Sequence, residues 1–218
     1  MRPKSPPDYL AAYPVALVAQ ARALIEQNRL AEHLLLKYPA AHQVRNDRAL
    51  YGYVQEIKEQ YLRNTGVLSH VAFDSTLHVM KNALGMHTRV ARVQGVRLKV
   101  KSEIRVAEVF KEMPAGFLRM IVVHELAHLK ESQHNKAFYL LCLNMEPDYH
   151  QLEFDLRVYL CYLNAGGKPI WTNGHGKFHH QGRQSCHDRF PLSNFPPHAG
   201  EMANESLREF NVQDVRRA

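Results

Sequence analysis

The stretch Ile121–Tyr139 reads IVVHELAHLKESQHNKAFY and contains an HExxH pattern from His124 to His128. Residues four positions apart lie on one face of an α-helix, so His124 and His128 can direct their imidazoles at one point. Glu125 lies about 100° around the helix from His124, close enough to reach a water molecule held at that point. Zinc suits this arrangement, because it binds neutral imidazoles and keeps one position open for water in catalytic sites. The pattern therefore predicts a metal-binding helix.

A third histidine, His134, follows six residues after His128. It shares their site only if the chain turns, and Ser132–Asn135 supplies a turn with Asn135 as the cap of a new helix. The alternative is a buried helix whose histidines make only structural hydrogen bonds. The helix is apolar on almost every side, so Glu125 is expected to be buried, and a buried charge is costly unless it is paired or near a metal. This cost favours the metal site.

The sequence HELAHLKESQHNKAFY resembles the signature of the YgjP-like zinc metallopeptidases, a gluzincin-like group related to the WLM and SprT families. The likeness extends upstream through FDSTLHVMKNALGMHTRVARVQGVRLKVKSEIRVAEVF and downstream through MEPDYHQLEFDLRVYL, over roughly residues 8–163. It implies one zinc ion per chain, held by His124, His128 and His134, with Glu125 as the catalytic base. It also implies a minimal zincin-like fold, and it leaves the substrate open.

The composition is ordinary for a soluble globular protein, with 45% hydrophobic and 22% charged residues in a chain of 218. No apolar run reaches the roughly 18 residues of a membrane span, and Met1–Pro7 lacks the apolar core of a secretory signal. The three cysteines, Cys142, Cys161 and Cys186, form neither a CxxC pair nor a disulfide framework. We therefore expect a cytoplasmic protein without a membrane partner. The net charge of +7 permits attraction to polyanions, but no dense basic run occurs, so we attribute it to solubility.

Hydrophobic periodicity predicts an α+β fold with N-terminal helices, a small mostly antiparallel sheet, the HExxH helix and two closing helices. Helical spacing runs from Pro14 to Pro39 with a break at Asn28, and a further helix is expected to be capped by Asp47. The expected strands are Val67–Phe73, Thr76–Met80, Thr88–Gln94, Val96–Lys101 and Glu103–Phe110. Pro114 opens the HExxH helix, and the closing helices are expected over Asn135–Met145 and from Pro147 to Leu163.

These elements divide the chain into three parts. Residues 1–13 are expected to be a flexible tail, residues 14–165 the metallopeptidase-like domain, and residues 166–218 a C-terminal extension rich in His, Gly and Pro. Such an extension can bind metal weakly but is more often a flexible tail. Trp171 and Phe178 are the candidates for attaching it to the domain.

Several residues around the motif are candidates for supporting the ligands or for donating a hydrogen bond to a developing oxyanion. They are Tyr139, Tyr149, His150, Glu153 and Arg157. Glu153 and Arg157 are four residues apart, so they are either a surface ion pair or a group that orients a ligand histidine, and we favour the surface pair. Asp155 is likewise either a surface group or a group that orients a ligand histidine.

The sequence supports three functions, of which a zinc metallopeptidase is the first. In it the metal activates a water molecule, Glu125 is the general base, and the substrate is a peptide or protein. The alternative is a metal-dependent nucleotide pyrophosphatase of the UTP type, as suggested for relatives in this family. The basic positions Arg97, Lys99 and Lys101 are its only further motivation, and no Gly-rich phosphate loop is present.

The third function is that of a nucleic-acid-associated protein like the SprT relatives. The chain departs from them, because no pair of CxxC motifs follows the catalytic helix. The oligomeric state stays open in all three cases.

Overall fold

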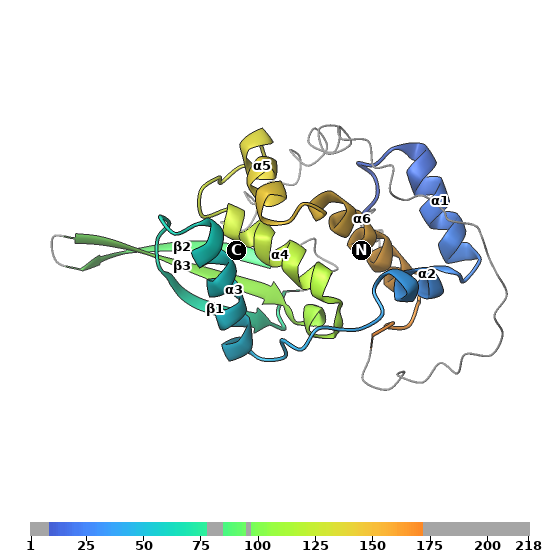
Figure 1. The fold of residues 1–218 in the computed structure, drawn as a ribbon, viewed down its shortest axis with the longest axis horizontal. Helices are drawn as coiled ribbons and strands as arrows, with labels where there is room; N and C mark the ends of the chain where they lie inside the picture. The colour runs from blue at the N-terminus through green and yellow to red at the C-terminus, as the bar shows by residue number, and fades with distance from the viewer. Residues whose placement is uncertain (1–8, 78–84, 95–96, 172–218) are drawn as a thin grey trace, which may run out of the picture.

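A three-stranded sheet with the strand order β1-β3-β2 forms one side of the molecule. The structure, a computed structural model, describes residues 9–77, 85–94 and 97–171 (Figure 1). The strands are β1 (Leu68–Asp74), β2 (Gly85–Gln94) and β3 (Arg97–Ala107). β2 and β3 form an antiparallel ribbon whose far end projects beyond the helices (Figure 1). β1 pairs with the second half of β3 in parallel. The longer pairing is thus the antiparallel one that the sequence predicted.

The prediction of two separate strands between Val96 and Phe110 is wrong, because β3 runs without a break to Ala107. No turn residue interrupts it, and Ser102, where the two predicted strands were divided, is buried and paired with both neighbouring strands. The chain then forms a short 3₁₀ helix, η2 (Glu108–Glu112), in place of the predicted strand end. The predicted strand at Thr76 begins instead as a turn, in which Asp74 Oδ1 accepts hydrogen bonds from the Thr76 backbone N–H (2.7 Å) and hydroxyl (2.6 Å). Residues 78–80 of that prediction lie outside the described residues.

The described residues form six α-helices. They are α1 (Val15–Glu26), α2 (Leu30–Lys37), α3 (Asp47–Tyr61), α4 (Ala115–Ala127), α5 (Lys136–Met145) and α6 (Tyr149–Asn164). Of these, α3 and α4 pack against the sheet. The predicted break at Asn28 is confirmed by its left-handed backbone (φ 56°), a conformation that Asn tolerates better than most residues. The predicted cap of α3 is corrected by one residue, because Asn46 accepts the hydrogen bond from the Ala49 N–H (2.9 Å).

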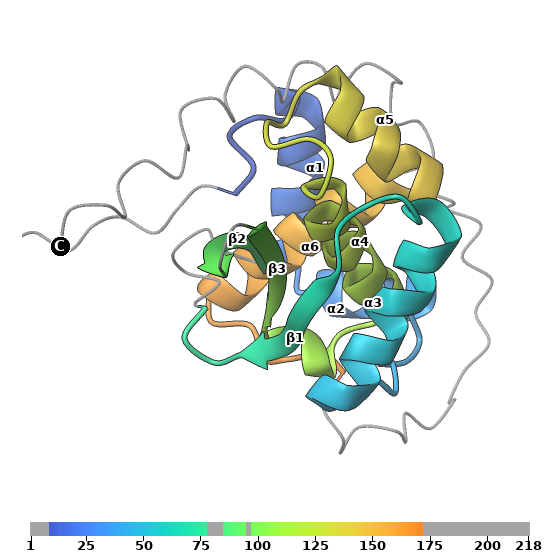
Figure 2. The same ribbon diagram turned by 90° about the vertical axis from the view of Figure 1, so that its left-hand side faces the viewer.

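The central element is α4, which contacts α3, α5, α6, β2 and β3 (Figures 1 and 2). Figure 2 shows α3 beside β1 and α5 above α4. Nine of the thirteen α4 residues are buried, from Phe117 to Ala127, as expected for a helix that is apolar on nearly every side. Burying such a helix fixes its position within the core, and the HExxH motif at its end is fixed with it.

The core extends beyond both predicted domain boundaries. Tyr9 and Leu10, assigned to a flexible tail, are buried (6% and 1% exposed), because their apolar side chains pack into the main cluster. Ile170 and Trp171 also belong to that cluster, and the Trp171 indole N–H donates to the Tyr38 carbonyl (2.7 Å). The predicted attachment by Trp171 is confirmed. Phe178 and the His-rich part of the extension lie outside the described residues.

Within the described parts of the chain, no helix has both the length and the apolar character needed to cross a bilayer.

Candidate metal centre

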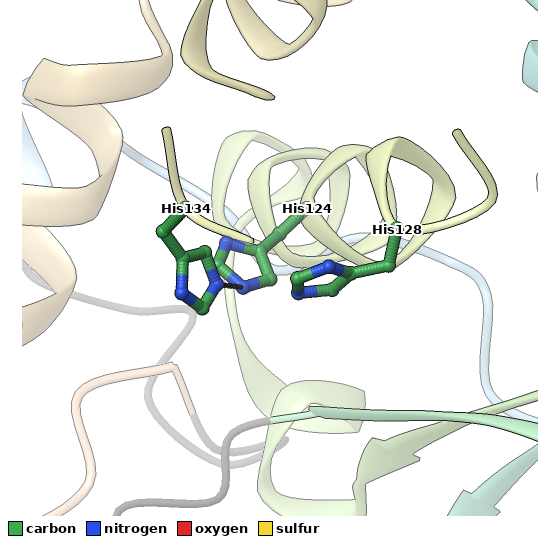
Figure 3. Close-up of side chains that lie close together, drawn as sticks. All are labelled: His124, His128 and His134. Carbon is green, nitrogen blue, oxygen red and sulfur yellow. Dashed lines mark hydrogen bonds between the residues drawn. The ribbon is translucent and has the colours of Figure 1, made fainter. Parts of the chain in front are cut away.

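Three histidine side chains converge at the end of α4. His124 lies in the last turn of the helix, His128 is the residue that ends it, and His134 comes from the loop that follows. One ring nitrogen from each lies within 4.8 Å of the other two, and Figure 3 shows the three rings gathered at one point. The Nε2 atoms of His124 and His134 are 3.1 Å apart. The turn predicted to bring His134 back to the motif is therefore present.

The loop between His128 and His134 is held by hydrogen bonds at both ends. The Ala127 carbonyl accepts from the N–H groups of Lys130 and Glu131, both at 3.0 Å, which ends α4 in a tight turn. At the other end Asn135 caps α5 by accepting from the Phe138 N–H at 2.9 Å, as the sequence predicts. His134 directly precedes this cap, so the start of α5 fixes its backbone.

Two contacts orient the ring nitrogens that point away from the centre. Nδ1 of His128 lies 3.0 Å from the Glu131 carbonyl oxygen. A carbonyl only accepts, so Nδ1 carries the proton and Nε2 keeps its lone pair free for a metal. Nδ1 of His124 lies 2.7 Å from the hydroxyl of Tyr149, a buried residue of α6. Tyr149, one of the predicted supporting residues, is therefore in direct contact with a ligand candidate.

The surroundings favour the neutral form of His124 and His134. Burial, followed by the neighbouring His128 and His134 rings, lowers the pKa of His124 well below its usual value. Burial and His128 lower the pKa of His134 to about 4. Neutral histidine is the form that binds a metal ion, and removing three imidazoles from water without a shared ligand is costly. The donor set therefore fits a divalent transition metal.

Glu125 is nearly inaccessible, with 3% of its surface exposed, and burial raises its pKa to about 8. Its carboxyl group lies against Gly85, the first residue of β2. A Cβ atom at position 85 would come 2.4 Å from Glu125 Oε1, which is too close for two heavy atoms that are not bonded to each other. The sequence around Gly85 gives no sign that this residue faces Glu125 across the fold, so the contact could not be predicted from it.

Of the other predicted supporting residues, Tyr139 lies beside the triad. The Tyr139 ring centroid is 6.5 Å from that of His134 and 5.4 Å from that of His150. Glu153 and Arg157 form an ion pair (Oε1 to Nη2, 2.7 Å) whose side chains are only 12% and 21% exposed. The favoured interpretation as a surface pair does not fit this burial. Asp155 belongs elsewhere, because its carboxylate accepts from Lys37 and Tyr38, both at 2.6 Å.

Comparison with known proteins agrees with this geometry. The matching family model is described as a YgjP-like metallopeptidase domain and spans residues 81–159, which include the whole triad. A protein of Escherichia coli (strain K12) named UTP pyrophosphatase is 56% identical over 162 residues, covering 74% of this chain and 97% of that relative. No solved structure matches the chain.

Proposed function

This chain belongs to the YgjP-like metallopeptidase family and is a metal-dependent hydrolase, and from that premise we propose that it is a zinc-dependent pyrophosphatase of nucleoside triphosphates such as UTP. The choice of nucleoside triphosphates as the substrate class is supported by the 56% identity to a protein named UTP pyrophosphatase, which extends over almost all of that protein's length. Three neutral imidazoles favour zinc, which commonly takes three protein ligands in catalytic sites.

The reaction consumes one water molecule and breaks the bond between the α-phosphorus and the oxygen that bridges it to the β-phosphorus. UTP then yields UMP and pyrophosphate. A zinc ion held by His124, His128 and His134 would supply positive charge, which lowers the pKa of a bound water and neutralises phosphate oxygens. This replaces the sequence-based preference for peptide substrates with the alternative that the sequence also supported.

The chain's own residues have separate parts in this mechanism. Glu125 follows the first ligand on α4, and in this proposal its carboxylate takes the proton of the attacking water. Gly85 leaves the space that this carboxyl group occupies. The Glu131 carbonyl holds the His128 ring in the tautomer that presents Nε2 to the centre, and the Tyr149 hydroxyl holds the orientation of the His124 ring.

Product analysis with isotopically labelled water tests the proposal. The zinc-loaded full-length chain is incubated with UTP in ¹⁸O-water, and the products are separated and weighed. Attack at the α-phosphorus places the label in UMP, and chelation of zinc or the substitution Glu125→Gln removes the activity. Label in pyrophosphate would mean attack at the β-phosphorus, and no UMP from zinc-loaded protein would contradict the proposal.

A peptidase remains the second candidate because of the position of β2. Among the described residues, β2 pairs only with β3, and it begins at Gly85 against Glu125. An extended peptide that added to the opposite edge of β2 would pass beside the triad. Cleavage of casein that depends on zinc and on Glu125, in the absence of UTP hydrolysis, would favour this function.

A further inference from the structure

One face of α6 begins with a residue that contacts the histidine triad and continues along two helical turns. Tyr149, Glu153 and Arg157 follow at intervals of four residues and therefore lie on the same face. The first of them contacts His124 directly through its hydroxyl. Long helical side chains lean towards the N-terminus of their helix, which brings the Arg157 guanidinium back over Glu153 and towards the triad.

The guanidinium of Arg157 is held on two sides. Its Nε and Nη2 atoms donate to a single oxygen of Glu153 (3.2 and 2.7 Å), and it hydrogen-bonds the hydroxyl of Tyr13. Tyr13 itself stands edge-on against Phe154 of α6, with ring centroids 5.0 Å apart. Guanidinium has five N–H bonds, and these contacts use three of them. The side chain keeps 21% of its surface exposed.

Arg157 lies two helical turns after Tyr149, whose hydroxyl contacts His124, and its ion pair with Glu153 holds it along the same face of α6. A fixed cation beside a metal site favours a ligand with more than one anionic group, because one group meets the metal and another meets the cation.

We propose that Arg157 is a substrate-binding residue that contacts an anionic phosphate oxygen beside the triad, and that Glu153 and Tyr13 position its guanidinium. The identification of the anion as phosphate rests on the proposed function. A preformed guanidinium loses little conformational entropy on binding, which is the advantage of holding it in place before the substrate arrives. The N-terminal segment that carries Tyr13 is then part of the substrate site.

A second arginine–glutamate pair provides a matched control. Arg119 donates to Glu146 at 2.6 Å, and its side chain is 29% exposed against 13% for the glutamate. Its guanidinium also donates to the Met145 carbonyl, so it ties α4 to the end of α5. Arg119 belongs to α4 and is not part of the α6 face that carries Tyr149, Glu153 and Arg157. It matches Arg157 in chemistry and burial but serves a different part of the fold.

The test measures the binding of inorganic pyrophosphate to the zinc-loaded full chain by titration calorimetry, with zinc content determined before and after. We expect Arg157→Gln to weaken binding by roughly tenfold to a hundredfold, as for loss of hydrogen bonds to a charged group, and Arg119→Gln to leave it within about twofold of wild type. Arg157→Lys keeps the positive charge but loses the planar set of guanidinium N–H donors, so its pyrophosphate affinity should lie between those of wild type and Arg157→Gln. If Arg157→Gln does not fold, an unchanged affinity in Arg157→Lys overturns the proposal.

The positioning residues require a measurement that a purely structural role would not change. Tyr13→Phe keeps the ring against Phe154 and removes only the hydroxyl, so pyrophosphate affinity should fall severalfold while the thermal unfolding midpoint stays close to that of wild type. Glu153→Gln should lower the affinity, and Glu153→Asp should restore part of it. Equal affinity in wild type, Tyr13→Phe and Glu153→Gln would remove both residues from the proposal.

The failure of this inference can be told apart from failure of the proposed function. If wild type releases no UMP from UTP while its pyrophosphate affinity still depends on Arg157, the pyrophosphatase function fails and the anion site stands. If wild type hydrolyses UTP and Arg157→Gln does so with unchanged KM, the anion site fails and the function stands. Failure of wild type to bind pyrophosphate also overturns the inference.

Discussion

The hydroxyl of Tyr149 lies 2.7 Å from Nδ1 of His124, joining α6 to the helix that carries the HExxH motif. Tyr149 is fully buried, and the hydroxyl reaches the ring nitrogen that faces away from the other two histidines. A partner at this position fixes the orientation of a ligand ring and raises its basicity. The site thus depends on α6 even though its ligands come from α4 and the following loop.

Replacing this tyrosine by phenylalanine should weaken metal binding. Tyr149→Phe keeps the ring and removes the hydrogen bond, so we expect zinc affinity to fall by roughly tenfold to a hundredfold. Competition with a chromophoric chelator measures the change. Tyr159→Phe is the control, because Tyr159 is a buried tyrosine of the same helix whose hydroxyl contacts the Ile170 N–H instead. Equal zinc affinity in both variants would show that the contact with His124 does not support the ligand.

The space beside Glu125 leads to a second prediction. Gly85→Ala places a Cβ atom 2.4 Å from Glu125 Oε1, so the carboxyl group must move. Zinc should remain bound, because none of the three histidines is displaced, while hydrolysis falls as it does in Glu125→Gln. Metal analysis and turnover are measured on the same preparation. Gly52→Ala on α3 is the control, because no atom lies within 4 Å of its added Cβ. It should leave turnover unchanged and stabilise the fold by about 0.5–1 kcal/mol.

The sequence predicts features that depend on neighbouring residues better than contacts that join distant parts of the chain. Asn28 and Asn135 are identified from their own neighbourhoods, because a left-handed residue and a helix cap are recognised over three or four positions. The parallel pairing of β1 with β3 and the contact of Gly85 with Glu125 join residues more than 30 positions apart, and no local pattern encodes them. The spacing of the motif predicts the two helical ligands, whereas the supporting role of Tyr149 required the packing of α6.

The cap of α5 should couple local stability to the metal site. Asn135→Ala removes the acceptor for the Phe138 N–H and should cost about 1 kcal/mol, measured by urea unfolding. Because Asn135 directly follows His134, the same change should also weaken zinc binding. Asn46→Ala removes an equivalent cap from α3, at 2.9 Å from the Ala49 N–H. That variant should lose similar stability and keep its zinc affinity, and a parallel loss of affinity in both would exclude local coupling.

The last prediction concerns the pH dependence of stability once zinc has been removed by a chelator. Burial raises the pKa of Glu125 from 4.5 to about 8 in the folded chain. Between these values the folded state holds a proton that the unfolded state releases, so the contribution of Glu125 to stability falls as pH rises from 4.5 to 8. The loss approaches roughly 1.4 kcal/mol per pH unit.

Glu125→Gln has no such proton, so the free energy of unfolding of the metal-free wild type should fall relative to this variant at each step from pH 5 to pH 8. His124 and His134 act in the opposite direction, because their lowered pKa values cost stability as pH falls below 6.5. They are present in both proteins, and their effect cancels when the two urea unfolding series are subtracted. Parallel series across this range would mean that the carboxyl group of Glu125 is ionised at neutral pH without a metal, and that its burial does not oppose the charge.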